Sequence, residues 1–158
     1  MRAVPALVLV ALTLWLGGCA TTLDPGTGDV SFRLRWDGTA DLDLHIVDPL
    51  GRHVGIEQAG PGSDYEAHLD QVRIWREAAT AHEDVPVGIL DIDCNADPTR
   101  VCERPIENVF WPTGTAPDGE YEVWVNHFQN VFGDESVAYE LEIRRGDRVV
   151  ERHRGEVD

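Results

Sequence analysis

Two short acidic segments carry the side chains best suited to binding a cation. Residues 41–46 read Asp-Leu-Asp-Leu-His-Ile, and residues 91–95 read Asp-Ile-Asp-Cys-Asn. Successive residues of a strand point to opposite faces, so each spacing places its polar side chains in one row. Carboxylate and amide oxygens are the ligands that calcium prefers, and several carboxylates buried together without a cation would be costly. The candidate ligands are Asp41, Asp43, Asp91, Asp93, Asn95 and Glu107.

The second segment is not an EF-hand. It places an oxygen-bearing side chain at every second residue, as calcium loops do, but no glycine follows Asn95 and Cys102 stands where the bidentate glutamate would be. Two alternatives therefore stay open. The chain has 29 Asp and Glu residues, so the cluster could be a solvated acidic face. With His45 included zinc is also an alternative, although one histidine among carboxylates is a weak zinc signal.

Catalysis is not favoured by the motifs. Asp43 and His45 share a strand face, which keeps a hydrolase with an Asp-His pair or a metal-bound water as an alternative. However, the chain has no nucleophile elbow and no His-Glu-x-x-His helix. We interpret His45 and His127 as structural histidines, and we expect His45 to orient a carboxylate. We therefore predict that the protein is not an enzyme.

Alternating apolar and polar residues predict an all-β domain over residues 30–158. Val30 to Trp36 has this pattern, and Asp48-Pro-Leu-Gly51 is typical of a type I turn that sends residues 52–56 back along the segment from Asp41. Further strands are expected at residues 87–93, 106–111, 120–128, 136–144 and 149–152. The strand at 120–128 is apolar on both faces, which predicts a central position in a sheet.

One helix is expected inside this β pattern. Ser63 to Glu66 has the form of a capping box, and Tyr65, Leu69, Val72 and Trp75 then follow on one helical stripe. The prediction places the helix from about Ser63 to Ala79, packed across the sheet.

The N-terminal residues predict that the protein is exported. Met1-Arg2 precedes an apolar run from Ala3 to Leu16, which has the form of a signal peptide over residues 1–18. Leu16-Gly-Gly-Cys19 resembles the lipobox of bacterial lipoproteins, in which the cysteine is lipidated and becomes the mature N-terminus. Ala20 stands where aspartate would indicate retention in the inner membrane, so this resemblance implies the outer membrane of a bacterial envelope. Residues 19–29 are expected to be a flexible tether.

Cys94 and Cys102 are predicted to form a disulfide, because two cysteines so close in an exported chain have no other partner once Cys19 is lipidated.

The formal net charge of −16 argues against a nucleic-acid partner, since affinity for phosphates depends on cationic groups.

Several motifs in order resemble the bacterial YfaP-like family of exported domains of unknown function. They are Thr39-Ala-Asp-Leu-Asp-Leu-His-Ile-Val-Asp-Pro-Leu-Gly51, Leu90-Asp-Ile-Asp93, Glu107-Asn108 and Ala116-Pro-Asp-Gly-Glu-Tyr-Glu-Val-Trp-Val-Asn126. The resemblance implies an antiparallel β-sandwich, Ig-like or jelly-roll-like. Residues 58–86 and the step at Arg104-Pro105 depart from the family pattern, which weakens any transfer of a site.

The expected function is a lipid-anchored binding or interaction module of the cell envelope with a structural calcium site. The alternative is a purely structural envelope protein, with exposed aromatics among Trp75, Trp111 and Trp124 contacting a protein or glycan partner.

Overall fold

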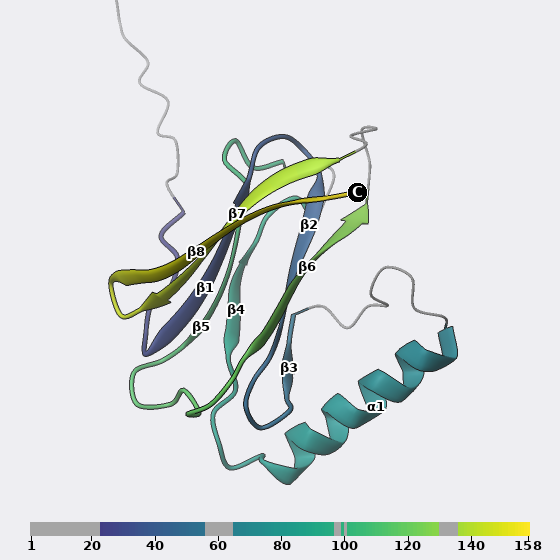
Figure 1. The fold of residues 1–158 in the computed structure, drawn as a ribbon, viewed down its shortest axis with the longest axis vertical. Coiled ribbons are helices and arrows are strands. Elements are labelled where there is room, and N and C mark those ends of the chain that lie inside the picture. Colours follow the sequence, from purple (N-terminus) through teal and green to yellow (C-terminus); the bar gives the residue numbers. More distant parts are fainter. Residues whose placement is uncertain (1–22, 56–64, 97–98, 100, 130–135) are drawn as a thin grey trace, which may run out of the picture.

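The protein folds into two antiparallel sheets packed face to face, with one helix beside the smaller sheet (Figure 1). This computed structural model describes residues 23–55, 65–96, 99, 101–129 and 136–158. The predicted signal peptide, Cys19 and the Ser63 cap lie outside these residues. Within the described ranges, no helix is both long and apolar enough to cross a bilayer.

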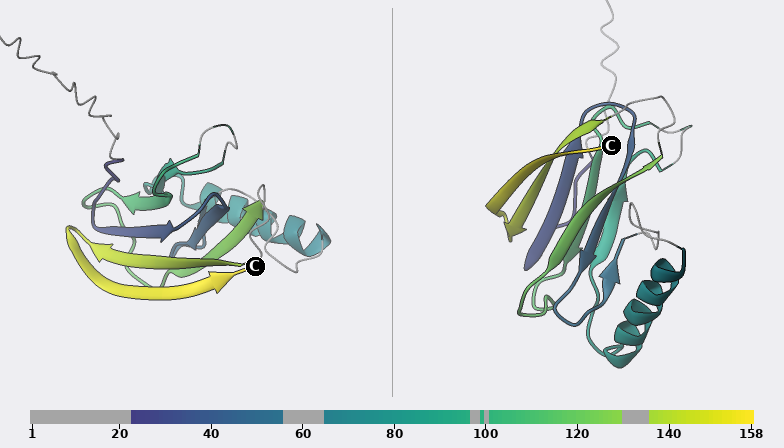
Figure 2. Two further views of the ribbon diagram at one scale, coloured as in Figure 1. Left: turned by 90° about the horizontal axis from the view of Figure 1, so that it is seen from above. Right: turned by 45° about the vertical axis from the view of Figure 1, so that its right-hand side comes forward.

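The larger sheet has five strands in the order β4-β5-β1-β7-β8, and the smaller has three in the order β3-β2-β6. Figure 2 shows the two layers from above and from an oblique direction. The predicted all-β sandwich with one helix is confirmed. The strands are β1 Val30–Trp36, β2 Asp41–Val47, β3 His53–Val54, β4 Ile89–Asp93, β5 Ile106–Trp111, β6 Glu122–Gln129, β7 Val137–Arg145 and β8 Arg148–Val157, and the helix is α1 Tyr65–Ala81.

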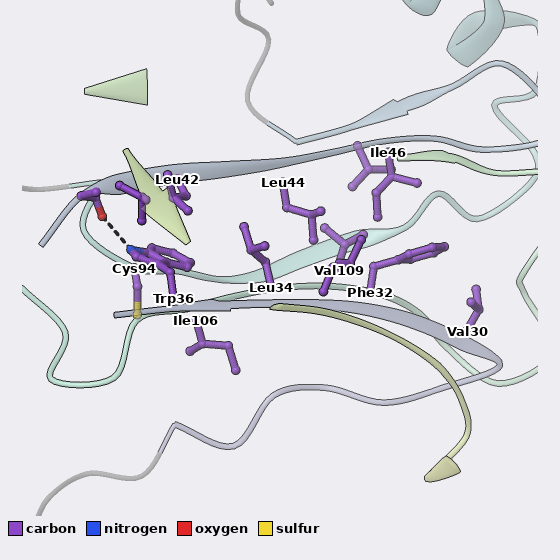
Figure 3. Packing of buried hydrophobic residues seen from close by; sticks show 14 of the residues in the cluster. Val30, Phe32, Leu34, Trp36, Leu42, Leu44, Ile46, Cys94, Ile106 and Val109 are labelled. Atoms are coloured by element: carbon purple, nitrogen blue, oxygen red, sulfur yellow. Dashed lines mark hydrogen bonds between the residues drawn. The ribbon is translucent and has the colours of Figure 1, made fainter. Parts of the chain in front are cut away.

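The hydrophobic core fills the space between the sheets (Figure 3). Phe32 and Leu34 of β1, Leu44 and Ile46 of β2, and Val109 of β5 are each at most 2% exposed. Burying one such side chain stabilises the fold by about 1.5–3 kcal/mol. Because these residues alternate with polar ones, the pattern of the sequence correctly predicts which face of β1 and β2 turns inward.

The turn after β2 forms as predicted and also anchors the segment after the helix. The backbone N–H of Gly51 donates to the Asp48 carbonyl at 2.8 Å, and Gly51 has the positive φ of 79° that this position favours. Arg52, 2% exposed, pairs with Asp48 at 2.7 Å and donates to the carbonyl of Pro86 at 3.0 Å. This buried ion pair therefore ties the β2–β3 hairpin to the chain between α1 and β4.

Helix α1 packs through Val72 and Trp75, the two residues of the predicted stripe whose side chains the structure describes. Val72 and Trp75 are buried, whereas Ile74 is 49% exposed. The Trp75 ring stacks on His53 of β3, with ring centroids 4.0 Å apart. The helix thus covers the outer face of the three-stranded sheet, and it ends at Ala81, two residues beyond the predicted end.

Strand β6 does not have the predicted central position, because it lies at the edge of the smaller sheet and β2 is central. Its two apolar faces have a different cause. Val123 and Val125 pack against the core, while Trp124 stacks with His45 and lies 6.0 Å from Trp75 of α1 between ring centroids. The helix therefore provides the second apolar environment that a neighbouring strand would provide in a central position.

Residues 23–29, which the sequence assigns to the tether, contact the five-stranded sheet. Gly26 N–H donates to Asp91 at 2.6 Å, and Asp29 accepts hydrogen bonds from the backbone of Gly114 and Thr115. A Cβ at Gly28 would lie 1.8 Å from the Trp111 carbonyl oxygen, so this close approach requires glycine.

Cys94 and Cys102 are disulfide-bonded, with their Cα atoms 5.8 Å apart and a separation of eight in sequence. Closing so short a loop contributes about 2.5 kcal/mol by restricting the unfolded chain. The bond holds the loop that follows Asp93, one of the predicted ligands.

Candidate functional site

Three of the predicted ligands meet at one edge of the sandwich. Asp41 and Asp43 of β2 and Asp93 of β4 each offer a carboxylate oxygen, and these three oxygens lie within 4.8 Å of one another. Asp43 is fully buried and Asp41 is 3% exposed, whereas Asp93 is exposed. The group is therefore closed on the β2 side and open to solvent on the β4 side, and it could hold a metal ion.

The short length of β3 explains why ligands from two sheets can meet here. Among the described residues, β3 pairs only with Ile46 and Val47, and no other described strand pairs with the earlier part of β2 on that side. Glu107 of β5 reaches this free edge and accepts a hydrogen bond from the backbone N–H of Leu44. Asp93 pairs with Glu107 across β4 and β5, so it arrives at the same place. Glu107, fully buried, is thus a fourth carboxylate beside the three aspartates.

Several oxygens of this cluster are buried without a hydrogen-bond partner. They are Oδ1 and Oδ2 of Asp43, Oδ1 of Asp41 and Oε1 of Glu107. Leaving one buried polar atom unpaired costs about 1–3 kcal/mol, more when it is charged. Three of the four oxygens belong to Asp41 and Asp43, which are members of the group that could hold a metal ion.

The pKa values of these carboxyl groups are all raised. Burial, together with the charges of Asp41 and Asp93, raises the pKa of Asp43 to about 7. Burial and the charge of Asp93 raise the pKa of Asp41 to about 6. Burial also raises the pKa of Asp93, and that of Glu107 rises well above its ordinary value for the same reason. A bound cation would oppose every one of these shifts, because it favours the charged carboxylates.

Asp91 does not join the cluster, although it stands two residues before Asp93. The register between β4 and β5 shifts between Leu90 and Ile92, which is a β-bulge. A bulge breaks the alternation of faces, so residues two apart no longer point the same way. Asp91 instead accepts hydrogen bonds from Gly26 N–H at 2.6 Å and from the Asn108 side chain at 2.7 Å.

Asn95 also has another role. Its side-chain amide donates to the carbonyl of Ala40 at 2.8 Å, and its oxygen accepts the backbone N–H of Cys102 at 2.9 Å. With a φ of 71°, the residue adopts the left-handed conformation that asparagine tolerates. Asn95 therefore links the disulfide loop to the start of β2 and is a support rather than a ligand.

His45 does not orient a carboxylate as predicted. Its Nδ1 lies 3.0 Å from Nε2 of His53, and its ring stacks on Trp124 with centroids 5.1 Å apart and parallel planes. Burial, with a smaller contribution from His53, lowers the pKa of His45 to about 4. The histidines and the tryptophans of α1 and β6 thus form a stacked aromatic layer next to the carboxylates. Sequence reasoning missed this layer because its members are far apart in the chain.

The tryptophans proposed as exposed partner contacts are mostly buried. Trp111 is fully buried and packs edge-on against Phe32, and Trp75 of α1 is 6% exposed. Trp124 is partly buried in the aromatic layer. The exposed large apolar side chains of the described residues lie elsewhere, for example at Phe128, which is 46% exposed.

No family model, curated protein or solved structure matches the chain. The function must therefore be inferred from the geometry of this molecule.

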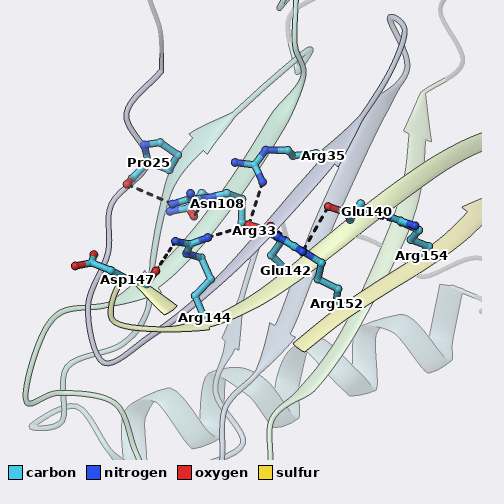
Figure 4. A network of polar contacts seen from close by, with 10 residues as sticks. All are labelled: Pro25, Arg33, Arg35, Asn108, Glu140, Glu142, Arg144, Asp147, Arg152 and Arg154. Atoms are coloured by element: carbon cyan, nitrogen blue, oxygen red, sulfur yellow. Dashed lines mark hydrogen bonds and ion pairs between the residues drawn. The ribbon is translucent and has the colours of Figure 1, made fainter. Parts of the chain in front are cut away.

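A second polar cluster, which the sequence analysis missed, covers the outer face of the larger sheet (Figure 4). Glu142 of β7 is 5% exposed and pairs with Arg35 at 3.1 Å, Arg144 at 3.0 Å and Arg152 at 2.8 Å. Although burial opposes it, hydrogen bonding to these arginines lowers the pKa of Glu142 to about 2. The spacing of Arg33 with Arg35 and of Arg152 with Arg154 is the sequence signal that could have predicted this face.

Proposed function

We propose that this protein is a lipid-anchored binding module of the bacterial cell envelope whose sandwich is held together by a structural calcium ion. The ion would be bound by Asp41, Asp43 and Asp93, with Glu107 beside them. The single observation that carries the proposal is Asp43, because it is fully buried and neither of its carboxylate oxygens has a hydrogen-bond partner.

Calcium fits this donor set better than zinc does. The three clustered side chains offer oxygen atoms alone, and calcium takes six to eight oxygens at about 2.3–2.6 Å. Two oxygens on opposite sides of such an ion lie about 5 Å apart, which agrees with a group spanning 4.8 Å. Zinc prefers nitrogen and sulfur ligands, and Nδ1 of His45 faces His53 instead.

The position of the cluster explains what the ion would do for the fold. Asp41 and Asp43 belong to the smaller sheet, whereas Asp93 and Glu107 belong to the larger one. A cation shared between them would close the edge of the sandwich that β3 is too short to cover. The role is therefore structural, and the binding partner of the module would be an envelope protein or glycan.

The proposed location in the cell envelope rests on the sequence. The apolar run and the lipobox at Cys19 support attachment to a membrane through lipid, and the resemblance to YfaP-like exported domains agrees with that location. The disulfide between Cys94 and Cys102 fits an oxidising compartment. We do not propose hydrolysis, since the histidine nearest to the carboxylates contacts a second histidine and a tryptophan.

Thermal unfolding in calcium tests the proposed site. An ion that binds only the folded state stabilises it by about 2.7 kcal/mol at a hundredfold excess over Kd, which raises Tm by about 10 °C for a domain of this size. We expect this rise in wild-type protein first treated with chelator. Asp43→Asn should fold, because it replaces a buried charge by a neutral group of the same shape, yet it should lose the response.

Asp93→Asn and Asp91→Asn form the matched pair of variants. The two aspartates stand two residues apart on one strand, but only Asp93 faces the cluster. Asp93→Asn should therefore weaken the calcium response, while Asp91→Asn should leave it intact. A Tm that is indifferent to calcium and chelator in the wild type would refute the site and leave a purely structural envelope protein.

A further inference from the structure

The outer face of the five-stranded sheet is basic, although the protein is strongly acidic. The outward positions of strands β1, β7 and β8 hold five arginines and three glutamates, a net charge of +2, in a chain whose formal charge is −16. The arginines are Arg33, Arg35, Arg144, Arg152 and Arg154. Five of the 13 arginines of the chain thus lie on one side of three adjacent strands.

The strand register brings these side chains to one face. Arg33 and Arg35 alternate with the core residues of β1 and pair across the strands with Glu142 and Glu140 of β7. The same two glutamates pair with Arg152 and Arg154 of β8. Figure 4 shows the guanidinium groups spread over the outside of the sheet. The face that they form is the arginine face.

The arginine face has more donors than its own carboxylates can use. One carboxylate, that of Glu142, serves three guanidinium groups. Nε of Arg144 is buried and has no hydrogen-bond partner. Arg33 donates to the neutral oxygens of Asn108 and Pro25, and burial together with the charges of Arg144 and Arg35 lowers its pKa. The surplus positive charge is accessible, since the side chains of Arg35, Arg152 and Arg154 are 44%, 56% and 80% exposed.

The chain that leads to the predicted anchor leaves the domain from this same face. The carbonyls of Pro25 and Gly26 accept hydrogen bonds from Arg33 and Asn108, which fixes the segment beside the guanidinium groups. Pro25 stands six positions after Cys19. Even fully extended, six residues reach about 20 Å, so a lipid on Cys19 would keep this face close to the bilayer.

We propose that the arginine face lies against the lipid headgroups of an anionic bilayer, with its guanidinium groups binding the lipid phosphates. Guanidinium groups present planar sets of donors that match phosphate oxygens. A surface of anionic lipids attracts each nearby arginine, and this attraction adds to the effect of the anchor. The inference rests on the proposed lipid anchor but not on the calcium site.

Backbone amide exchange of the lipidated protein tests this orientation. The mature protein is inserted into vesicles of phosphatidylcholine alone, or of phosphatidylcholine with phosphatidylglycerol. We expect the amides of β8 to exchange about tenfold more slowly on the anionic vesicles, because the edge strand is then held at the surface, while amides of α1 are unchanged. High salt should remove this protection.

Charge variants give the matched control. Arg35→Gln, Arg152→Gln and Arg154→Gln combined should lose the protection of β8. The control combines Arg73→Gln, Arg76→Gln and Arg104→Gln. This variant loses the same charge from exposed residues elsewhere, and it should keep the protection of β8. Equal exchange of the wild type on both vesicles, or equal loss in both triple variants, would overturn the proposal. Protection by inorganic phosphate without vesicles would also overturn it, because it would indicate a site for free anions.

Two further measurements separate this inference from the proposed function. Asp43→Asn should keep the protection of β8 even if it loses its calcium response. An unmodified mass at Cys19, with protein that does not remain on vesicles, would contradict the anchor and the membrane orientation together.

Discussion

Two buried carboxylates of this protein have opposite surroundings. Glu142 is enclosed by three arginines, and its pKa falls to about 2 despite burial. Glu107 lies among three aspartates, and its pKa rises well above the ordinary value, mainly through burial. The negative charge of Glu142 is balanced by arginines of the chain itself. The second belongs to the group for which we propose an ion.

Glu142→Gln tests the contribution of the arginine cluster through pH. A carboxylate with a depressed pKa stabilises the folded state above its unfolded pKa, and the stabilisation is lost as pH falls through the folded value. We expect the variant to be about 2 kcal/mol less stable than the wild type near pH 7, a value reduced by the exposure of Arg35 and Arg152. The difference should shrink between about pH 4.5 and pH 2, as measured by urea unfolding.

The control for this experiment is Glu156→Gln, a change of the same kind at an exposed position of β8. It should alter the free energy of unfolding by less than about 0.5 kcal/mol. A constant difference between Glu142→Gln and the wild type from pH 7 to pH 2 would contradict the ion-pair explanation.

At the scale of elements, β2 organises both the core and the site. Its even-numbered residues pack into the core, and its odd-numbered ones contact the carboxylate cluster at one end and the aromatic layer at the other. Helix α1 completes this second face by placing Trp75 over His53. Strand β2, whose outer face would be exposed without the helix, is therefore buried on both faces.

Trp75→Ala should detach the helix from the sheet. Removing a buried tryptophan costs about 3–5 kcal/mol when its cavity cannot collapse. We expect a loss of about 3 kcal/mol in urea unfolding, together with faster amide exchange throughout α1, because Val72 is the other buried apolar side chain described in the helix.

Ile74→Ala is the matched control, since Ile74 stands next to Trp75 in sequence and is 49% exposed. Its effect on stability should stay below about 0.5 kcal/mol. Similar losses in the two variants would contradict docking through Trp75, because alanine is the better helix former and neither substitution lowers helix propensity.

At the scale of the whole molecule, opposite charges lie on different parts of the sandwich. The arginine face covers β1, β7 and β8, whereas the carboxylate cluster lies where β2 meets β4 (Figure 1). In the proposed orientation the basic face contacts the bilayer and the chain toward Cys19 starts beside it. The remaining surface, including α1, then faces away from the lipid and is available to envelope partners.

Cys19→Ser tests the anchor on which this orientation depends. Without the thiol no lipid can be attached, so the protein should move from the membrane fraction to the soluble periplasm, as followed by immunoblot of the fractions. The double variant Cys94→Ser and Cys102→Ser should remain with the membrane, because those cysteines are bonded to each other. Unchanged partition of Cys19→Ser, with an unmodified wild-type mass at Cys19, would contradict lipidation.

Interactions between residues close in the chain made much of this fold predictable. The alternation in β1 and β5 predicts bounds that agree with the structure, and the Asp48 to Gly51 turn depends on a hydrogen bond between residues three apart. The disulfide was predictable for the same reason, since Cys94 and Cys102 are neighbours in sequence. The same local alternation placed Asp41 and Asp43 in one row, and with Asp93 they are the three of the six predicted ligands that the structure brings into one group.

Only the tertiary structure decided which polar side chains meet. Leu44 and Glu107, which are hydrogen-bonded at the site, are 63 residues apart in sequence, and no local pattern encodes that contact. The bulge in β4 turned Asp91 away from Asp93, and the packing of α1 made His45 part of an aromatic layer. Local propensity determines where strands and turns form, but the register and layering of the sheets determine which of their faces come together.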